Sequence, residues 1–352
     1  MPLESTRAYN LMNLLYGIAV ADAIGTPWNN VQPEDLPVSG LLKKTVQEKD
    51  LLNPPKKYRQ TSLPLGTWGE STGLTLATVE GASKAVAANE PFNLSYYMSQ
   101  EFLRWGNKEK YICDNRDIER SSTVLTALDA ISRSVFINNQ QYTSNDSSAL
   151  ARMLPVALFL YEKEQRGFSW IDREGEEATD YDIVYNACSL THAHDLTVFC
   201  CYLYIQLIKK CLFYKPLDQE DKAMTFNKII ADYKALNFNT NVLSKNEEDQ
   251  KKIADILSGQ ILKYSANDLS NNDFVLDAFI CAIWHWYNYS NYRDGMLRVL
   301  CLGGNTAKNA VITCGLLSIT SDVPVDYVEL LKDRVKIVYI YNDWTKRFKY
   351  AV

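Results

Sequence analysis

Hydrophobic positions recur at helical spacing along almost the whole chain. Apolar side chains three and four residues apart share one face of an α-helix, whereas a strand alternates with a period of two. Strand-like alternation is nearly absent, and we find no internal repeat. The pattern predicts an all-α protein of roughly a dozen helices around one core. Four clear groups with helical spacing are Leu11, Leu14, Leu15 and Ile18; Leu74, Leu76, Ala77, Val79 and Ala82; Leu150, Met153, Leu154, Ala157 and Leu158; and Val275, Ala278, Phe279, Ala282 and Ile283.

One segment, residues 31–66, departs from this pattern. It holds five of the eleven prolines and no sustained periodicity. A loop this long inside a compact domain is usually a cover or a binding segment. We therefore expect residues 1–352 to form a single domain in which residues 31–66 are a proline-rich loop over a cleft.

The composition is that of an ordinary soluble globular protein, with 47% hydrophobic and 22% charged residues. The net charge of −5 supplies no basic stripe for a phosphate backbone, which argues against nucleic acid as a primary partner. No apolar run reaches the roughly 18 residues of a membrane span, and the opening MPLESTRAYN lacks the order of a signal peptide. We expect a cytoplasmic protein without a membrane partner.

The eight cysteines include no C-x-x-C pair, and most stand inside apolar stretches. This placement predicts reduced thiols that serve as small hydrophobic residues rather than a disulfide framework.

The stretch GESTG, residues 69–73, formally matches the nucleophile elbow G-x-S-x-G, with Ser71 as the nucleophile. That motif requires a strand that ends, and a helix that begins, at the serine. The preceding TSLPLGTW contains a proline and a glycine within a chain that reads as helical, so it cannot be a central strand. We therefore reject the serine hydrolase interpretation.

The three histidines and Asp22 have plain structural interpretations. His192 and His194 are two residues apart, unlike the i, i+4 spacing of a helical zinc pair, and we expect them to be capping or loop residues between two helices. His285 lies in the aromatic run IWHWYNY, which indicates core or partner surface. Asp22 ends an apolar helix, where an acid needs hydrogen bonds, and it is expected to accept them from a neighbouring helix N-terminus.

Five segments, taken in order, resemble the ADP-ribosylglycohydrolase family, all-α hydrolases that use two magnesium ions to remove ADP-ribose. The family patterns G-D-A-x-G-x-P-x-E, G-x-W-T-D-D-T, N-G-x-x-M-R-x-x-P, T-H and G-G-D-T-D-T-x-A-x-x-x-G are matched here by ADAIGTPWN, GTWGEST, SSALARMLP, Thr191-His192 and GGNTAKNAVITCG. The resemblance covers nearly the whole chain and implies the compact orthogonal multi-helix fold of that family.

The departures from the family fall on its metal ligands. The Thr-Asp-Asp set falls on Gly69, Glu70 and Ser71, which retains one acid, and the glutamate of the first pattern falls on Asn29. The second ligand set falls on residues 305, 307 and 308, which are Asn, Ala and Lys. Magnesium needs hard oxygen ligands, mainly carboxylates. With four of five acids gone, we predict that the magnesium centre is lost and that no metal is bound.

The loop CLGGNTAKNA has the glycines and helix start of an anion- or ion-binding turn but no carboxylate. We interpret it as an inherited scaffold in which Lys308 neutralises Glu70 in place of an ion. The family's Asn-Gly reads Ser147-Ser148 here, while Arg152 and Pro155 match but are equally suited to helix packing. The residues expected at the cleft are Asp22, Asn29, Glu70, Ser71, Thr72, Ser147, Ser148, Gly303, Gly304, Asn305, Thr306 and Lys308.

Three functions remain open from the sequence. The first is a pseudoenzyme that binds a protein, such as an ADP-ribosyltransferase blocked by an immunity protein, or an ADP-ribosylated protein. Contact regions would be residues 31–66, the stretch around Trp284 and Trp286, and the acidic surface. The second is a metal-free ADP-ribosyl hydrolase with Glu70 as general acid/base and Asp22 as helper. The third is a scaffold protein with a vestigial cleft. Whether the cleft binds ADP-ribose is not determined by side-chain identities.

Overall fold

The computed structural model describes residues 3–32, 61–88, 90–133, 144–166 and 177–350, together with Leu36 and Leu52. These residues form fifteen α-helices and no β-strand; one isolated antiparallel bridge joins Asp146 and Phe274. The predicted all-α class is therefore confirmed. Most of the predicted loop 31–66 lies outside the described residues. The helices are α1 (Leu3–Gly25), α3 (Glu70–Ala87), α4 (Leu94–Gly106), α5 (Ser122–Ser132), α6 (Ser148–Arg152), α7 (Leu154–Arg166), α8 (Asp180–Ser189), α9 (Asp195–Tyr214), α10 (Gln219–Ala235), α11 (Glu247–Ser258), α12 (Val275–Asn288), α13 (Tyr292–Leu300), α14 (Thr306–Leu317), α15 (Val325–Leu330) and α16 (Arg334–Tyr350).

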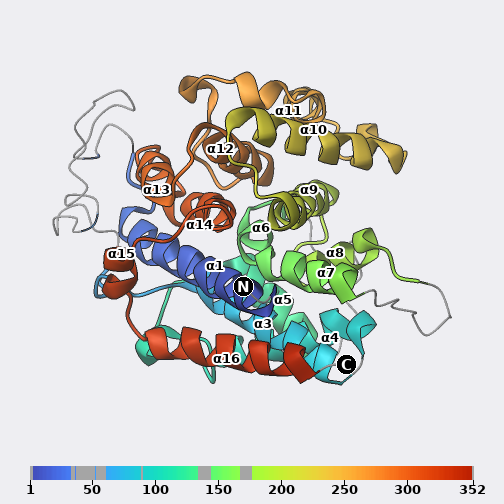
Figure 1. Cartoon of the computed structure of the whole chain (residues 1–352). Coiled ribbons are helices and arrows are strands. Elements are labelled where there is room, and N and C mark those ends of the chain that lie inside the picture. Colours follow the sequence, from blue (N-terminus) through green and yellow to red (C-terminus); the bar gives the residue numbers. More distant parts are fainter. Residues whose placement is uncertain are drawn as a thin grey trace.

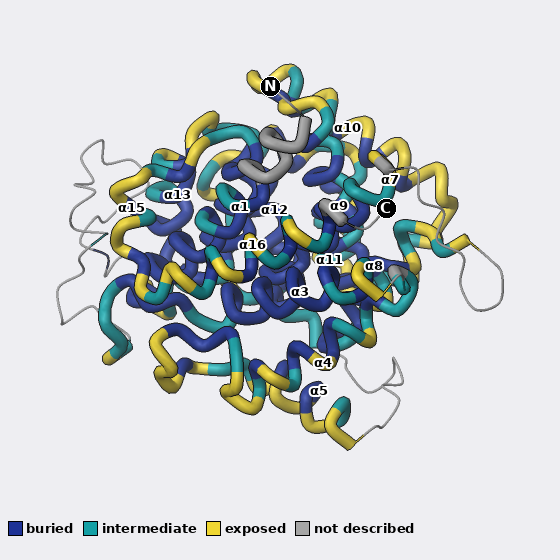
Figure 2. The backbone as a smooth tube through the Cα atoms, turned by 60° about the horizontal axis from the view of Figure 1, so that its bottom comes forward, coloured by how far each residue is buried: buried dark blue, intermediate teal, exposed yellow. Residues whose placement is uncertain are grey.

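The centre of the molecule is built around α1, α3 and α14. Helix α1 packs along α14, α14 also contacts α12 and α13, and α3 packs between α4 and α16. Figure 1 shows α10 and α11 on the side of the molecule opposite α3 and α16. Nearly all buried apolar side chains belong to one cluster, and Figure 2 shows this buried interior surrounded by exposed loops and helix faces.

The local sequence explains where several helices begin and end. Thr179 and Asp182 form a capping box at the start of α8, and Asp218 and Asn246 cap α10 and α11 with their side chains. Helix α11 ends at Gly259, whose φ of 73° is the left-handed conformation favoured at a helix C-terminus. His194 caps α9 by accepting a hydrogen bond from the Leu196 amide at 3.2 Å, which confirms its predicted capping role.

Helix α1 approaches α14 closely enough to bring its polar C-terminal residues to the start of α14. A Cβ atom at Gly25 would lie 2.8 Å from the Cα atom of Ala307, so only glycine permits this approach. The first turn of α14 and the last turn of α1 therefore share one wall of the site described below.

Helix α9 is long and apolar enough to cross a membrane by length and composition alone. However, 78% of its most apolar window is buried inside the protein. Within the part of the chain that the structure describes, α9 is thus a core helix of a globular fold.

The aromatic stretch on α12 is also part of the core. Trp286 and His285 are fully buried and Trp284 is only 8% exposed. The expectation that this stretch offers a contact surface is wrong, because α9, α10, α11 and α14 cover the helix. His285 Nδ1 donates a hydrogen bond to the Cys281 carbonyl of its own helix at 2.8 Å.

All eight cysteines are free and buried, as predicted from their apolar surroundings. Burial raises the pKa of the Cys281 thiol to about 12, so this thiol stays protonated at neutral pH. These cysteines serve as packing residues.

Candidate functional site

The start of α3 is held by Asp22, which reaches across from α1. Its Oδ2 atom accepts hydrogen bonds from the Gly69 amide (2.9 Å), the Thr72 amide (2.9 Å) and the Thr72 hydroxyl (2.7 Å). Burial raises the pKa of Asp22, and these hydrogen bonds partly oppose the rise. Asp22 is the polar anchor that its position predicted, because its Oδ2 atom already accepts three hydrogen bonds from the start of α3.

Glu70 is the first residue of α3, and its carboxylate lies deep in the site. Its Oε2 atom accepts a hydrogen bond from the Ser121 amide at 2.7 Å. Burial raises the pKa of Glu70 to about 7, while that hydrogen bond and the positive charge of Lys308 act in the opposite direction. A carboxyl group with such a pKa can exchange a proton near neutral pH.

Lys308 is the one residue of α14 that is not fully buried. Its Nζ atom lies 2.6 Å from Asp273 Oδ2 and 3.7 Å from Asp146 Oδ1, and no ion pair joins it to Glu70. Burial alone would lower the pKa of Lys308, but the carboxylates of Asp273 and Asp146 outweigh it and raise the pKa. The predicted neutralisation of Glu70 by Lys308 does not take the form of an ion pair, because two nearer carboxylates hold the ammonium; the charge of Lys308 acts on Glu70 only from a longer distance.

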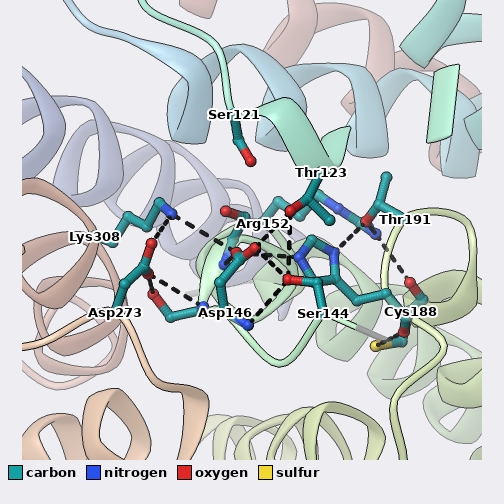
Figure 3. A network of polar contacts seen from close by, with 12 residues as sticks. Ser121, Thr123, Ser144, Asp146, Arg152, Cys188, Thr191, Asp273 and Lys308 are labelled. Atoms are coloured by element: carbon teal, nitrogen blue, oxygen red, sulfur yellow. Dashed lines mark hydrogen bonds and ion pairs between the residues drawn. The ribbon is translucent and has the colours of Figure 1, made fainter. Parts of the chain in front are cut away.

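Figure 3 shows Asp146 close to Lys308. Asp146 also contacts the buried side chain of His192. Its Oδ1 atom is 3.1 Å from His192 Nε2, and its Oδ2 atom accepts from the Thr123 and Ser144 hydroxyls at 3.0 and 2.8 Å. Although burial acts the other way, His192, Lys308 and Ser148 together hold the pKa of Asp146 well below its usual range. Burial lowers the pKa of His192 despite this carboxylate.

Arg152 lies behind this network and acts as a packing residue. It is fully buried, with its guanidinium 4.8 Å from the centre of the Phe102 ring. It donates to the Thr191 hydroxyl at 2.7 Å and to the carbonyls of Ala187 and Cys188 on α8. These contacts agree with helix packing, the alternative role that the sequence suggests for Arg152 in the segment SSALARMLP.

The two glycines before α14 allow their loop to pack closely against the loop that contains Asn271. Gly303 and Gly304 have φ values of 67° and 64°, and a Cβ atom at Gly304 would lie 2.3 Å from the Asn271 carbonyl oxygen. The Gly304 amide donates to the Val31 carbonyl at 2.9 Å. Asn29 Oδ1 accepts from the Ala307 amide at 2.8 Å and so occupies part of the α14 N-terminus.

These elements enclose a cavity of about 750 Å³. Of the predicted cleft residues, six line it: Asp22, Asn29, Glu70, Ser71, Asn305 and Lys308. The other six, Thr72, Ser147, Ser148, Gly303, Gly304 and Thr306, do not line the cavity and belong to its surrounding structure. Thr61 and Leu63, from the described end of the segment 31–66, also line it.

Sequence reasoning missed Asp146, Asp273 and Ser121, which lie in loops outside the five matched patterns. Asp273 accepts hydrogen bonds from the Ser147 hydroxyl (2.6 Å) and from Asn305 Nδ2 (2.9 Å), in addition to its ion pair with Lys308. Asp146 directly precedes the matched segment SSALARMLP, which is the one signal that could have pointed to it.

A family model for the ADP-ribosylglycohydrolases matches residues 4–348. The chain belongs to the ADP-ribosylglycohydrolase family. A solved structure described as an "ADP-ribosylglycohydrolase-related protein complex" aligns with a TM-score of 0.65 over 98% of this chain and 99% of that chain. The two sequences are 13% identical, so this likeness concerns the fold alone. No curated protein sequence matches the chain.

The side chains at this family member's site are poorly suited to two magnesium ions. Magnesium pairs require several carboxylates free to bind the metal. Here Asp273 and Asp146 are paired with an ammonium, Asp22 accepts three hydrogen bonds, and residues 305 and 307 carry no acid. Among the described residues, no group of three or more His, Cys, Asp or Glu side chains is arranged to hold a metal ion.

Glu70 should make the stability of this ADP-ribosylglycohydrolase-family chain decrease as pH rises. Its folded-state pKa of about 7 lies above the value of about 4.3 expected in the unfolded chain. The stability linked to this group is therefore fully present below about pH 4 and is lost as pH rises through about 7. We expect Glu70→Gln to reduce the pH dependence of the free energy of unfolding, measured with urea, between pH 4.5 and 7.5. Glu119→Gln, an exposed carboxylate in the same cavity, is the control, and equal slopes in all three proteins would contradict this prediction.

Proposed function

We propose that this chain is a pseudoenzyme of its family, one that has lost the two-magnesium centre and acts by binding a protein. The observation that carries the proposal is the ammonium of Lys308, ion-paired with Asp273 and Asp146 at the start of α14. A metal ion there would have to displace a cation that is already neutralised by two carboxylates. Residues 305 and 307, where the family's aspartates are expected, offer an amide and a methyl group instead.

The partner class that best fits the family is an ADP-ribosyltransferase, as for an immunity protein, or an ADP-ribosylated protein. With the α12 aromatic residues in the core, the remaining contact candidates are residues 31–66, most of which lie outside the described residues, and the acidic surface. Free, buried thiols are in keeping with a cytoplasmic site of action.

A titration with magnesium and with ADP-ribose tests the loss of the metal centre. We expect the native protein to show no magnesium binding by calorimetry and no release of ADP-ribose from modified protein. A variant with Ser71→Asp, Asn305→Asp, Ala307→Asp, Lys308→Thr and Asn29→Glu restores the family's acids, and we expect it to gain magnesium affinity. Magnesium-dependent ADP-ribose binding or hydrolysis by the native protein would refute the proposal.

One observation favours a second candidate, a metal-free glycosidic hydrolase. Glu70 has a pKa of about 7 and lines a cavity large enough for a small ligand, so it could protonate a leaving group. Asp22 is unsuitable as its helper because one of its oxygens already accepts three hydrogen bonds. Release of ADP-ribose that persists in chelator and is abolished by Glu70→Gln would establish this activity.

A further inference from the structure

Helix α16 lies at the edge of the molecule, beneath α1 and α3 in Figure 1, and its two faces differ in character. The inner face packs against α3 and α1 with buried apolar side chains. The outer face repeats at the same helical spacing on the opposite side, and its positions are exposed. The inner stripe consists of Ile337, Ile340, Trp344 and Phe348. The outer stripe consists of Val335, Tyr339, Asn342 and Lys346.

The outer stripe begins with two apolar side chains that protrude into solvent. Val335 is 78% exposed and Tyr339 is 64% exposed, and they stand one helical turn apart on the same face. Single exposed apolar residues are ordinary, but two neighbours form a continuous apolar surface. A tyrosine beside an aliphatic residue is typical of the centre of a protein interface. Neither residue lines the cavity at the start of α3, so this surface is separate from that site.

The charge of this segment is opposite to that of the whole protein. The net charge is −5, but residues 332–347 hold five basic residues and two acidic ones. Each acid pairs with a basic residue of the segment at 2.7 Å. These pairs are Asp333 with Lys336 and Asp343 with Arg347.

The three other basic residues of the segment are free to meet a partner. All three are exposed, and no ion pair involves them among the residues that the structure describes. They are Lys332, Arg334 and Lys346. The outer face of α16 therefore combines an apolar centre with unpaired positive charges at both of its ends.

The beginning of this face is held in place by the segment that leads into α3. The Lys332 amide donates to the Gly66 carbonyl at 2.9 Å, and Trp68 Nε1 donates to the Lys332 carbonyl at 3.0 Å. A Cβ atom at Gly66 would clash with the Leu330 carbonyl oxygen, so only glycine permits this approach. A surface whose backbone is fixed before binding loses less conformational entropy when a partner docks.

We infer that the outer face of α16 binds an acidic segment of the partner protein that carries an aromatic or aliphatic side chain. This inference rests on the proposed function, since it names the surface and the chemistry through which a protein is bound. The unpaired cations attract carboxylates, while Val335 and Tyr339 cover an apolar side chain. A lipid surface suits this face less well, because a helix that lies in a membrane buries a whole apolar face and here Asn342 and Lys346 occupy half of the stripe.

The experiment selects displayed random peptides on the immobilised full chain and titrates the enriched peptides by fluorescence anisotropy. We expect these peptides to combine Asp or Glu with Trp, Phe or Leu, and to bind more weakly as salt screens the exposed charges. Val335→Ser with Tyr339→Ser should weaken them at least about tenfold, because the apolar centre is lost. Arg334→Gln with Lys346→Gln should weaken them at least about threefold and reduce the effect of salt.

A matched control replaces two apolar side chains of similar exposure elsewhere. Tyr214 and Leu217, at the turn between α9 and α10, are 74% and 76% exposed. Tyr214→Ser with Leu217→Ser should leave the affinity of the peptides unchanged within the error of the titration. Thermal unfolding verifies that every variant is folded, and exposed positions such as these seldom change stability much.

Each outcome supports or overturns the inference. Enriched peptides without acidic residues, equal affinity for Val335→Ser with Tyr339→Ser, or no enrichment at all would overturn it. Sedimentation with phosphatidylserine vesicles but not with phosphatidylcholine vesicles, lost in that same variant, would assign the face to an anionic lipid surface instead. None of these results concerns the metal centre, whose loss is judged by the magnesium titration and the hydrolase assay, so the two proposals fail separately.

Discussion

Replacing Asp22 with alanine should lower the free energy of unfolding by about 3–5 kcal/mol, because three donors at the start of α3 lose their acceptor together. Asp22 is 2% exposed, so water has little access to replace the carboxylate. The loss also removes the cap of a helix whose residues are almost all buried, and loss of a cap alone costs about 1 kcal/mol. Urea unfolding measures the change.

Asp22→Asn is the matched control for that experiment. An asparagine Oδ1 can accept the same three hydrogen bonds, and the amide has no buried negative charge. We expect this variant to lose less than about 1 kcal/mol. Burial raises the pKa of Asp22 above its value in the unfolded chain. The native carboxylate therefore lowers the free energy of unfolding as pH rises above that unfolded-chain pKa, and Asp22→Asn removes this contribution to the pH dependence. Equal losses in the two variants would show that the hydrogen bonds are not what Asp22 contributes.

Replacing Lys308 with methionine should lower the free energy of unfolding by about 2–3 kcal/mol. The reason is that the carboxylates of Asp146 and Asp273 would lose the ammonium that pairs with both of them. Loss of one partner of a fully buried pair costs about 3–5 kcal/mol. The value expected here is smaller because the side chain of Asp273 is 44% exposed and water can stabilise its charge in part.

Two comparisons test the origin of that loss. Adding Asp273→Asn to Lys308→Met should recover at least half of the lost stability, because it removes one of the two carboxylates that lack a cation. Lys228→Met, in an exposed pair with Asp232 on α10, should leave the urea-unfolding midpoint unchanged within the error of the measurement. Native-like stability of Lys308→Met would mean that the ammonium is not needed to neutralise the carboxylates of Asp146 and Asp273, and this result would weaken the proposed function.

The ion pairs of Lys308 also show how the carboxylates at the start of α14 are balanced from within the chain. Two carboxylates that face each other repel unless a cation lies between them. A lysine from the first turn of α14 supplies that charge from within the chain. Glu70, at the start of α3, lines the same cavity, and its Oε2 atom accepts a hydrogen bond from the Ser121 amide.

The sequence by itself determined the helical class and the family. Helical spacing and capping residues act within a few positions of each other, so Thr179, Asp218 and Asn246 could act as caps whatever packed around them. That positions 29, 71, 305 and 307 carry no acid is likewise visible without coordinates. The interpretation of Asp22 as an anchor succeeded because a buried acid must find donors.

Only the tertiary structure decided which charges meet. Lys308 pairs with Asp273, 35 positions away, and Glu70 accepts from Ser121, 51 positions away, and no local pattern encodes either contact. The burial of Trp284 and Trp286 was equally hidden, because an aromatic run looks the same in a core and on a binding surface. Ion pairing depends on distances of a few ångströms, and such distances between loops arise from helix packing rather than from the residues that flank each charge.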